Sequence, residues 1–264
     1  MTRLLLEDFR KNRRSYQHGS VKNPSLLIIL VCGFILLVAV LAWFALERVK
    51  EKIQTEVGDA LQIVSETTHE SLDIWVKSNY FHLNRLANDL RLVSLTEQQL
   101  QVPRNKSSLS ESQILKELRS FFWRHKNEVG QAGFFIIAPD FVNIASGRDS
   151  NIGAKNLIAN QALDLLNRAF QGETVWVPPI WSDVSLSPSS EGNPKKPPTM
   201  FFAAPIKNTE GEIIAVVTQR VNPTRDYRRL IQLGRIGKSG ETYAFDRYGR
   251  LLSQSRFDED LHKT

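Results

Sequence analysis

The most constraining feature of the sequence is an uncharged apolar stretch near its start. Residues Leu26 to Leu46 are 21 consecutive residues (LLIILVCGFILLVAVLAWFAL) without Asp, Glu, Lys or Arg. A helix rises about 1.5 Å per residue, so roughly 20 apolar residues are needed to cross the hydrocarbon core of a bilayer, about 30 Å thick. Only a helix satisfies its own backbone hydrogen bonds in lipid. The stretch therefore predicts one transmembrane helix over residues 26–46.

The charges that flank this stretch predict its orientation. Residues 1–46 contain six Lys or Arg and two acidic residues, which gives them a net charge of +4 out of +6 for the chain. Cytoplasmic flanks of transmembrane helices are enriched in Lys and Arg. We therefore expect residues 1–25 to be a basic cytoplasmic tail, the helix to lie in the inner (cytoplasmic) membrane, and the remainder to be periplasmic or extracellular.

Two other readings of the apolar stretch are a buried core helix and a cleaved signal peptide. A core helix is usually shorter or interrupted by polar residues. A signal peptide has an apolar core of about 7–15 residues followed by a small-residue cleavage site. This stretch instead ends with the bulky Trp43 and Phe44, which favours an uncleaved anchor.

The part of the chain after the span has the composition of a folded, disulfide-free domain. Its net charge is only +2 of the +6, so it offers no broad attraction for nucleic acid, and we expect none to bind. Cys32 is the only cysteine and lies within the span. The exterior part therefore has no disulfide and no thiolate-ligated metal site, and a packed core must stabilise it.

A helical pattern follows the span directly. Over residues 47–95 apolar side chains recur mostly three or four apart without proline, at Val49, Ile53, Val57, Leu61, Val64, Leu72, Trp75, Leu83, Leu86, Leu90 and Val93. We interpret residues 47–95 as an extracytoplasmic stalk helix. A helix of roughly 50 residues is too long to be buried along its whole length in one small domain, so we expect a homodimer through the stalk. The alternative is two helices with a bend near Thr67 and Thr68.

Shorter helices are expected beyond the stalk. Residues 96–112 are polar and include a proline, which indicates a connector. Ser110 is a candidate N-cap for a second helix over residues 111–126. Helical spacing returns over residues 160–170, and Gly172 is placed to end that helix.

Alternating apolar residues between and after these helices predict strands. The expected strands cover residues 133–138, 141–145, 174–181, 200–206 and 212–221. Prolines make 174–181 suitable for an edge or ligand-facing strand, and 182–198 is a loop by composition. The turn Asn208-Thr209-Glu210-Gly211 predicts a hairpin. The fold class is therefore α+β: an antiparallel sheet with helices packed on it.

The end of the chain suggests a further unit. A short helix is expected around residues 224–233, followed by a hairpin of strands 241–246 and 250–255. A lone two-stranded hairpin is at best marginally stable. We therefore expect the chain to be cut within its next module.

At this point the residues resemble a known family. Residues 237–253 (GKSGETYAFDRYGRLLS) resemble the start of the second module of a double-Cache sensor, with a Gly-rich turn, a strand, an Asp/Gly turn and a second strand. The strands over 134–145 and 203–217 resemble its first module. The resemblance implies a PAS-like antiparallel sheet of about five strands with the stalk helix alongside. In that scheme residues 96–233 are a membrane-distal Cache module and residues 234–264 begin an incomplete membrane-proximal one.

The resemblance also implies a ligand-binding pocket. In the amino-acid-binding branch of the family, an Asp at the end of the last strand pairs with the ligand's ammonium group. The corresponding position here is Arg220, and the branch's Arg-x-Trp-Tyr element is absent. An Arg there would grip a carboxylate or another anion, so free α-amino acids are not expected to bind by that scheme. The alternative is a surface arginine on a strand end.

Trp176, Trp181 and Asp183 complete the predicted ligand site, because they lie on the strand that lines the pocket in the relatives. Small-molecule pockets combine aromatic walls with a few polar anchors. The alternative is that the two tryptophans fill the core.

No motif in the sequence predicts catalysis. Residues 234–239 imitate a phosphate-binding loop, but Gln232 stands where that motif needs a glycine, and a strand follows in place of a helix. The five histidines are scattered without metal-ligand spacing. We therefore expect no enzyme activity, metal or cofactor in this chain.

Members of the resembled family are extracytoplasmic sensors of chemoreceptors, histidine kinases and nucleotide cyclases. The function predicted from the sequence is accordingly the ligand-sensing region of a single- or double-pass membrane receptor, which binds a small molecule. The alternative is a membrane-anchored protein-interaction module without a small-molecule ligand. An extracytoplasmic hydrolase is a third reading, and the lack of any catalytic triad or metal set counts against it.

Overall fold

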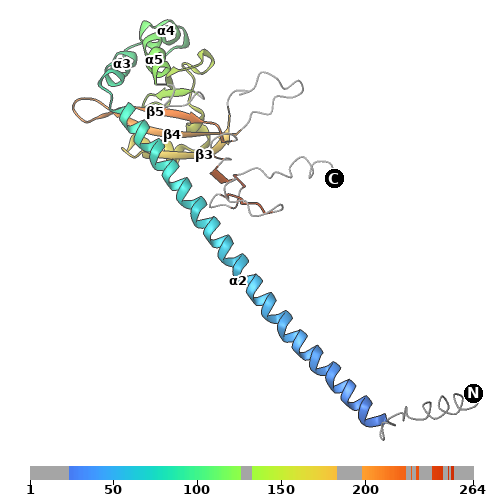
Figure 1. The fold of residues 1–264 in the computed structure, drawn as a ribbon. Coiled ribbons are helices and arrows are strands. Elements are labelled where there is room, and N and C mark those ends of the chain that lie inside the picture. Colours follow the sequence, from blue (N-terminus) through green and yellow to red (C-terminus); the bar gives the residue numbers. More distant parts are fainter. Residues whose placement is uncertain are drawn as a thin grey trace, which may run out of the picture. The chain divides into compact units, whose positions relative to one another are not determined.

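The computed structural model describes residues 24–125, 133–182, 198–223, 227, 230–231, 240–245, 249 and 251–252. The chain divides into two compact units, Met1–Ala60 and Leu61–Thr264. The first described element is the helix α2 (Pro24–Ala87), 64 residues long (Figure 1). By length and composition, one helix in the described part of the chain, spanning Ser25–Ala87, could cross a membrane. The expected span 26–46 and most of the expected stalk thus form one continuous helix.

The end of α2 differs from the expected boundary at residue 95. The helix ends at Ala87, and the side chain of Asp89 caps a new helix by accepting hydrogen bonds from the backbone N–H groups of Arg91 and Leu92. The alternative of a bend near Thr67 is wrong, because α2 continues through that position. There the Thr67 hydroxyl donates to the Ile63 carbonyl within the helix, at 2.8 Å.

Three short helices follow in the segment for which a connector and one helix were expected. They are α3 (Leu90–Leu100), α4 (Lys106–Glu111) and α5 (Gln113–Arg124). The cap of α5 is Ser112, whose hydroxyl accepts from the N–H of Ile114, and not Ser110. Asn105 caps α4 in the same way by accepting from Ser108 N–H. Polar composition over 96–112 therefore reflects capping residues and exposed helix faces.

Five antiparallel strands form one sheet in the order β2-β1-β5-β4-β3. The strands are β1 (Phe134–Ile137), β2 (Asn143–Ser146), β3 (Val175–Trp181), β4 (Pro198–Lys207) and β5 (Ile213–Val221). β3 lies at an edge, as its prolines predict, and β4 and β5 form the expected hairpin around Asn208. The fold class is therefore confirmed: an α+β, PAS-like sheet with a long N-terminal helix.

Small helices separate β2 from β3. They are the 3-10 turn η2 (Asp149–Asn151), α7 (Leu157–Gln161) and α8 (Leu163–Phe170), where one helix over 160–170 was expected. The end of α8 agrees with the sequence: Gly172 has a φ of 103°, and its N–H donates to the Ala169 carbonyl. A left-handed glycine just beyond the last turn is the usual helix stop.

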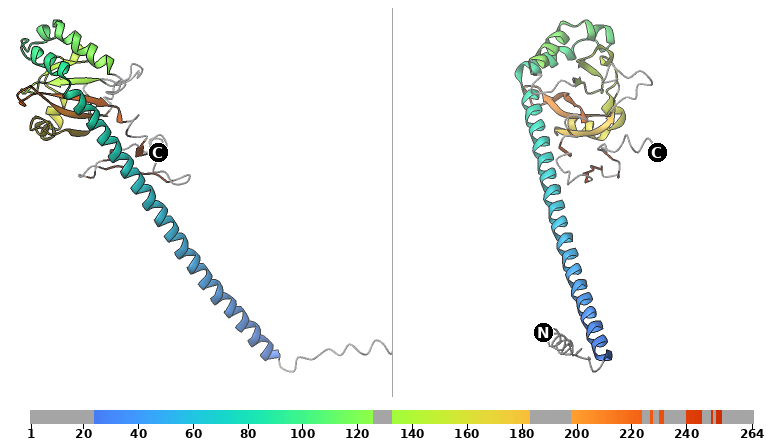
Figure 2. Two further views of the ribbon diagram at one scale, coloured as in Figure 1. Left: turned by 60° about the vertical axis from the view of Figure 1, so that its left-hand side comes forward. Right: turned by 45° about the vertical axis from the view of Figure 1, so that its right-hand side comes forward.

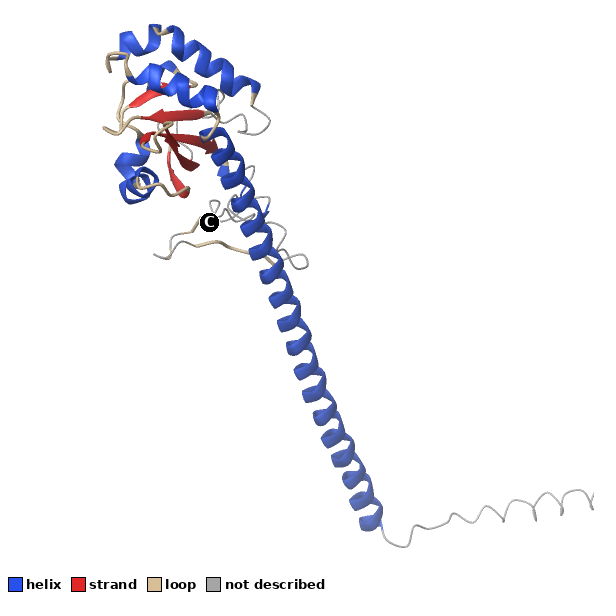
Figure 3. Cartoon of the chain, turned by 90° about the vertical axis from the view of Figure 1, so that its left-hand side faces the viewer, coloured by secondary structure: helices blue, strands red, loops and turns tan. Residues whose placement is uncertain are grey.

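The sheet has a packed layer on each face, and helices are drawn on both sides of it in Figures 2 and 3. Strand residues alternate between these faces. What we call the α2/α5 face carries Phe134, Ile136, Phe202, Ala204 and Val217, packed against Leu83, Leu86, Leu92, Leu118 and Phe121 of the N-terminal helices. What we call the α7/α8 face carries Phe135, Ile137, Val175, Val177, Phe201, Ala203 and Val216, packed against Leu157, Ile158, Leu166 and Ala169.

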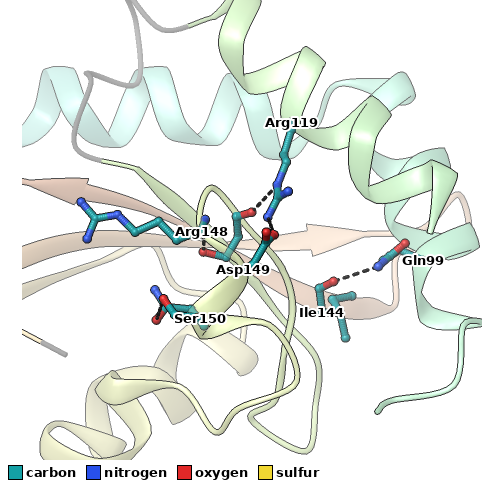
Figure 4. Close-up of polar contacts among 8 residues, drawn as sticks. Gln99, Arg119, Ile144, Arg148, Asp149 and Ser150 are labelled. Carbon is teal, nitrogen blue, oxygen red and sulfur yellow. Dashed lines mark hydrogen bonds and ion pairs between the residues drawn. The ribbon is translucent and has the colours of Figure 1, made fainter. Parts of the chain in front are cut away.

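Two side chains hold the N-terminal helices to β2 (Figure 4). The amide of Gln99 donates to the Ile144 carbonyl at 2.9 Å, and Arg119 Nε donates to the Ser146 carbonyl at 2.9 Å. Arg119 also pairs with Asp149 at 2.5 Å. These bonds satisfy outward carbonyls of an edge strand, which would otherwise lack partners.

The second predicted hairpin is described only in part. Phe245 and Leu251 form an antiparallel bridge, and the Leu252 N–H donates to the Ala244 carbonyl at 2.7 Å. This agrees with a turn around Gly249. The expected helix over 224–233 and the remainder of 234–264 lie largely outside the described residues, so the two-module division stays a prediction.

Candidate functional site

Arg220 is a buried charge on the α7/α8 face. On β5 it follows Val216 and Thr218 at two-residue steps, so all three point to the same side of the sheet. Only 4% of Arg220 is exposed. The alternative of a surface arginine on a strand end is therefore wrong.

Two aromatic rings and a hydroxyl are among the contacts of the Arg220 guanidinium. Its Cζ lies 5.4 Å from the ring centroid of Phe135 and 5.1 Å from that of Phe201. Its Nη1 donates to the Ser182 hydroxyl at 3.3 Å. A buried charge is costly unless polar and aromatic partners hold it. The arrangement fixes a planar cation in a largely apolar layer, which suits an anion with an apolar body.

Thr199 is another buried polar side chain on the same face, besides Thr218. Thr199 precedes Phe201 by two residues on β4, so both point toward the α7/α8 layer. Thr199 is fully buried, and its hydroxyl has no hydrogen-bond partner in the structure. The sequence analysis missed Thr199 and Ser182. Thr199 could have been found from the sequence, because it is a hydroxyl residue two positions before Phe201 on a strand whose two faces are both buried.

The end of β3 is fastened beside this group. The Gln161 side chain donates to the Trp181 carbonyl at 2.9 Å and accepts from the Trp181 N–H at 3.0 Å. A side-chain amide thus replaces a missing strand neighbour at the sheet edge. These two bonds hold the backbone of Trp181 against α7. They therefore also position the next residue, Ser182, which accepts a hydrogen bond from Arg220.

The structure does not bring the predicted tryptophans to Arg220. Trp176 lies on the α2/α5 face, the opposite side of the sheet from Arg220. Trp181 is 70% exposed at the end of β3. Asp183 lies outside the described residues. Ligand contact by these three residues stays a prediction.

Trp176 belongs to an aromatic cluster between α2 and the sheet. Its ring centroid lies 6.4 Å from that of Trp75 and 6.0 Å from that of Tyr227, and Trp75 in turn contacts Phe202 at 5.2 Å. Burial raises the pKa of the Tyr227 phenol, and also that of Tyr80. Both hydroxyls therefore stay protonated at neutral pH. The core-filling reading of Trp176 fits this position.

A separate cavity of about 350 Å³ lies between α2 and the C-terminal segment. Its lining is Leu61, Val64, Ser65 and residues 240–243. None of the predicted site residues contributes to it. Within the described ranges, no group of three or more His, Cys, Asp or Glu side chains is placed to hold a metal ion.

Comparisons with known proteins give weak similarities to sensor domains. No protein-family model matches the chain, and no curated protein sequence matches it. The chain is similar to the sensor domain of the V. cholerae histidine kinase DctB, with 15% identity and a TM-score of 0.45 over 72% of this chain and 61% of that one. It is also similar to the ligand-binding domain of the Campylobacter jejuni chemoreceptor Tlp3 in complex with 4-methylisoleucine, with 13% identity and a TM-score of 0.48 over 77% and 69%.

A third similar structure is the ligand-binding domain of the Pseudomonas aeruginosa PAO1 amino acid chemoreceptor PctC in complex with GABA. The identity is 12% and the TM-score 0.41, over 78% of this chain and 77% of that one. Of the DctB sensor domain, the chain spans about 61% of the length. At TM-scores below 0.5, these similarities do not determine a function.

Proposed function

We propose that this chain is the extracytoplasmic ligand-sensing region of a membrane signal-transduction receptor of the chemoreceptor, histidine kinase or nucleotide-cyclase type. The single observation that carries the proposal is Arg220, a buried cation between Phe135 and Phe201 on one face of a PAS-like sheet. Buried, specifically held charges in an apolar setting are characteristic of binding sites. The ligand is a small molecule with a carboxylate, and the chain itself catalyses no reaction.

The route from the site to the membrane-spanning helix runs through β3. Ser182, which follows the last residue of β3, contacts Arg220. At the other end of the strand, the Thr174 hydroxyl donates to the Asn84 side chain of α2 at 2.6 Å. A ligand that repositions Arg220 would therefore shift β3 and bias two arrangements of α2. We propose that α2 crosses the inner membrane with residues 1–25 on the cytoplasmic side.

Three exposed apolar residues on one line of α2, with Glu70 between them, support a homodimer through this helix; we call them the apolar stripe. Ile63, Ile74 and Phe81 are all exposed. They lie 11 and 7 residues apart, so at about 100° per residue all three project within roughly 20° of one line. Leu83, which packs on the sheet, projects about 160° away from that line. The stripe therefore faces away from the sheet, and a second copy of α2 is the occupant we propose.

The test of the sensing function is ligand binding by the full chain in lipid nanodiscs. We expect a screen of carboxylates, amines and nucleobases by thermal shift to yield carboxylates. The Arg220→Gln variant should bind those hits at least about tenfold more weakly, since a hydrogen bond to a charged group contributes about 1.5–3 kcal/mol. Arg168→Gln is the matched control, because Arg168 is half-exposed and pairs with Glu173. Equal affinities for wild type and Arg220→Gln would contradict the proposed site.

A membrane-anchored protein-interaction module is the second candidate. The observation in its favour is the exposure of two large aromatic side chains, Trp123 and Trp181. Exposed aromatic residues are enriched at protein interfaces. If this candidate is correct, Trp181→Ala abolishes capture of a protein partner, while the thermal-shift screen yields no small molecule.

A further inference from the structure

We propose that Thr199 is a second anchor of the site at Arg220, and that the ligand is a carboxylate whose oxygens accept hydrogen bonds from both side chains. This inference rests on the proposed sensing function and deepens it. Thr199 was not predicted from the sequence. Its proposed role follows from the strand registers and from its buried hydroxyl, which has no hydrogen-bond partner in the structure.

The registers place Thr199 beside the Arg220 side chain. Arg220 on β5 is paired with Phe201 on β4, and Thr199 on β4 is paired with Ile180 on β3. Arg220 nevertheless reaches Ser182, beyond the far end of β3. Because β4 lies between β5 and β3, the Arg220 side chain extends over β4 toward the end of β3. The part of β4 that it passes presents Phe201 and Thr199 to the α7/α8 face.

The hydroxyl of Thr199 is anomalous for a core position. It is fully buried and has no partner, although buried polar groups are nearly always hydrogen-bonded. Thr218 lies on the same face and shows the ordinary case: its hydroxyl accepts from the Phe135 N–H at 3.2 Å. Thr199 therefore retains a hydrogen-bond donor on the same face as the Arg220 cation, and a carboxylate can accept hydrogen bonds from both groups.

The side chains near Arg220 indicate the remainder of the ligand. The rings of Phe135 and Phe201 lie next to the guanidinium, and most side chains of the layer around them are apolar. An anion that fits must be compact and carry a hydrophobic body. Benzoate and butyrate represent an aromatic and an aliphatic member of this class, and their amides are uncharged isosteres.

The experiment compares Thr199→Val, Thr199→Ser and Thr218→Val with wild type, using the full chain in nanodiscs titrated with benzoate and butyrate. Valine matches threonine in volume without the hydroxyl. We expect Thr199→Val to weaken binding of the better carboxylate about tenfold. We also expect it to leave the Tm unchanged or raised, since an unpartnered buried hydroxyl is removed. Thr199→Ser should bind nearly as wild type, and Thr218→Val should lower the Tm because the Phe135 N–H loses its acceptor.

The outcomes separate this inference from the proposed function. If Arg220→Gln abolishes carboxylate binding while Thr199→Val binds as wild type, Thr199 is no anchor and the sensing function stands. If benzamide binds as tightly as benzoate, the anion class is overturned. If neither carboxylate binds wild type, but another small molecule binds in an Arg220-dependent manner, the carboxylate class fails and sensing remains. A lower Tm for Thr199→Val would assign Thr199 a structural role instead.

Discussion

Gly153 shows how a single residue sets a close approach between two segments. Its φ is +73°, and a Cβ there would lie 3.1 Å from the backbone of Lys106. Gly153→Ala should therefore destabilise the protein by about 2–3 kcal/mol, from the left-handed conformation and the clash together. Gly211→Ala is the control, because Gly211 has a φ of +87° with open space around it, and should cost only about 1 kcal/mol. Urea denaturation of both variants measures the difference, and equal losses would contradict the clash.

The position of Arg220 could be predicted from the sequence, whereas its surroundings could not. The end of a strongly patterned strand is visible in the local sequence, and Arg220 lies at the end of β5, one residue before Val221. The neighbours of Arg220 depend on cross-strand register. The pairing of β3 with β4 shifts between Val177 and Ile180, at the two prolines. That irregularity decides which residues share a face with Arg220, and no local pattern encodes it.

Trp176 illustrates the same limit. Consecutive strand residues point to opposite faces, so an error of one residue transfers a side chain across the sheet. The sequence analysis grouped Trp176 with Arg220 because the strand as a whole lines the pocket in relatives. The structure packs Trp176 against Trp75 of α2. Its membership in a ligand site stays a prediction, and its contact with the long helix is the observed fact.

The boundary between α2 and α3 depends on a cap that is one residue long. Asp89 accepts hydrogen bonds from Arg91 N–H at 2.8 Å and from Leu92 N–H at 3.2 Å. Asp89→Ala should lower the free energy of unfolding by about 1 kcal/mol, since it leaves both N–H groups without a side-chain acceptor. Asp89→Asn should retain most of that stability, because its amide oxygen accepts the same bonds. Chemical denaturation followed by tryptophan fluorescence tests both, and a neutral Asp89→Ala would show that the cap is dispensable.

Periodicity predicted the helical character of residues 47–87 and failed at the helix end. Leu90 and Val93 continue the apolar spacing of the stalk, so the pattern runs across the break without interruption. The break itself is made by capping bonds of Asn88 and Asp89. A cap competes with helix continuation through local hydrogen bonds, and it leaves no mark in the spacing of apolar residues.

At the scale of the whole molecule, the apolar stripe on α2 predicts self-association. Ile74→Glu should weaken the dimer at least about tenfold, because it would bury a charge at the centre of the proposed contact. Leu90→Glu is the control, since Leu90 is also an exposed apolar residue but lies on α3. Cross-linking of the full chain in detergent, over a range of protein concentrations, measures the change. A monomeric wild type, or equal dimer fractions in the two variants, would contradict the proposed interface.

The overall class of the fold was accessible from the sequence because its signals are long or repeated. The 21-residue apolar span, the helical stalk and the β4–β5 hairpin each rest on many residues that agree. The split of one expected helix into α7 and α8, at Ala162, rests on a single residue. Elements were therefore predicted better than their boundaries, and boundaries better than the contacts between elements.

The unbroken course of α2 has a consequence for how such a chain can be altered. In an α-helix each added residue advances the phase by about 100° and the length by about 1.5 Å. Eighteen added residues restore the original phase, whereas two reverse much of it. Insertions or deletions in α2 therefore change the length and phase of the helix without changing the identity of the residues that remain.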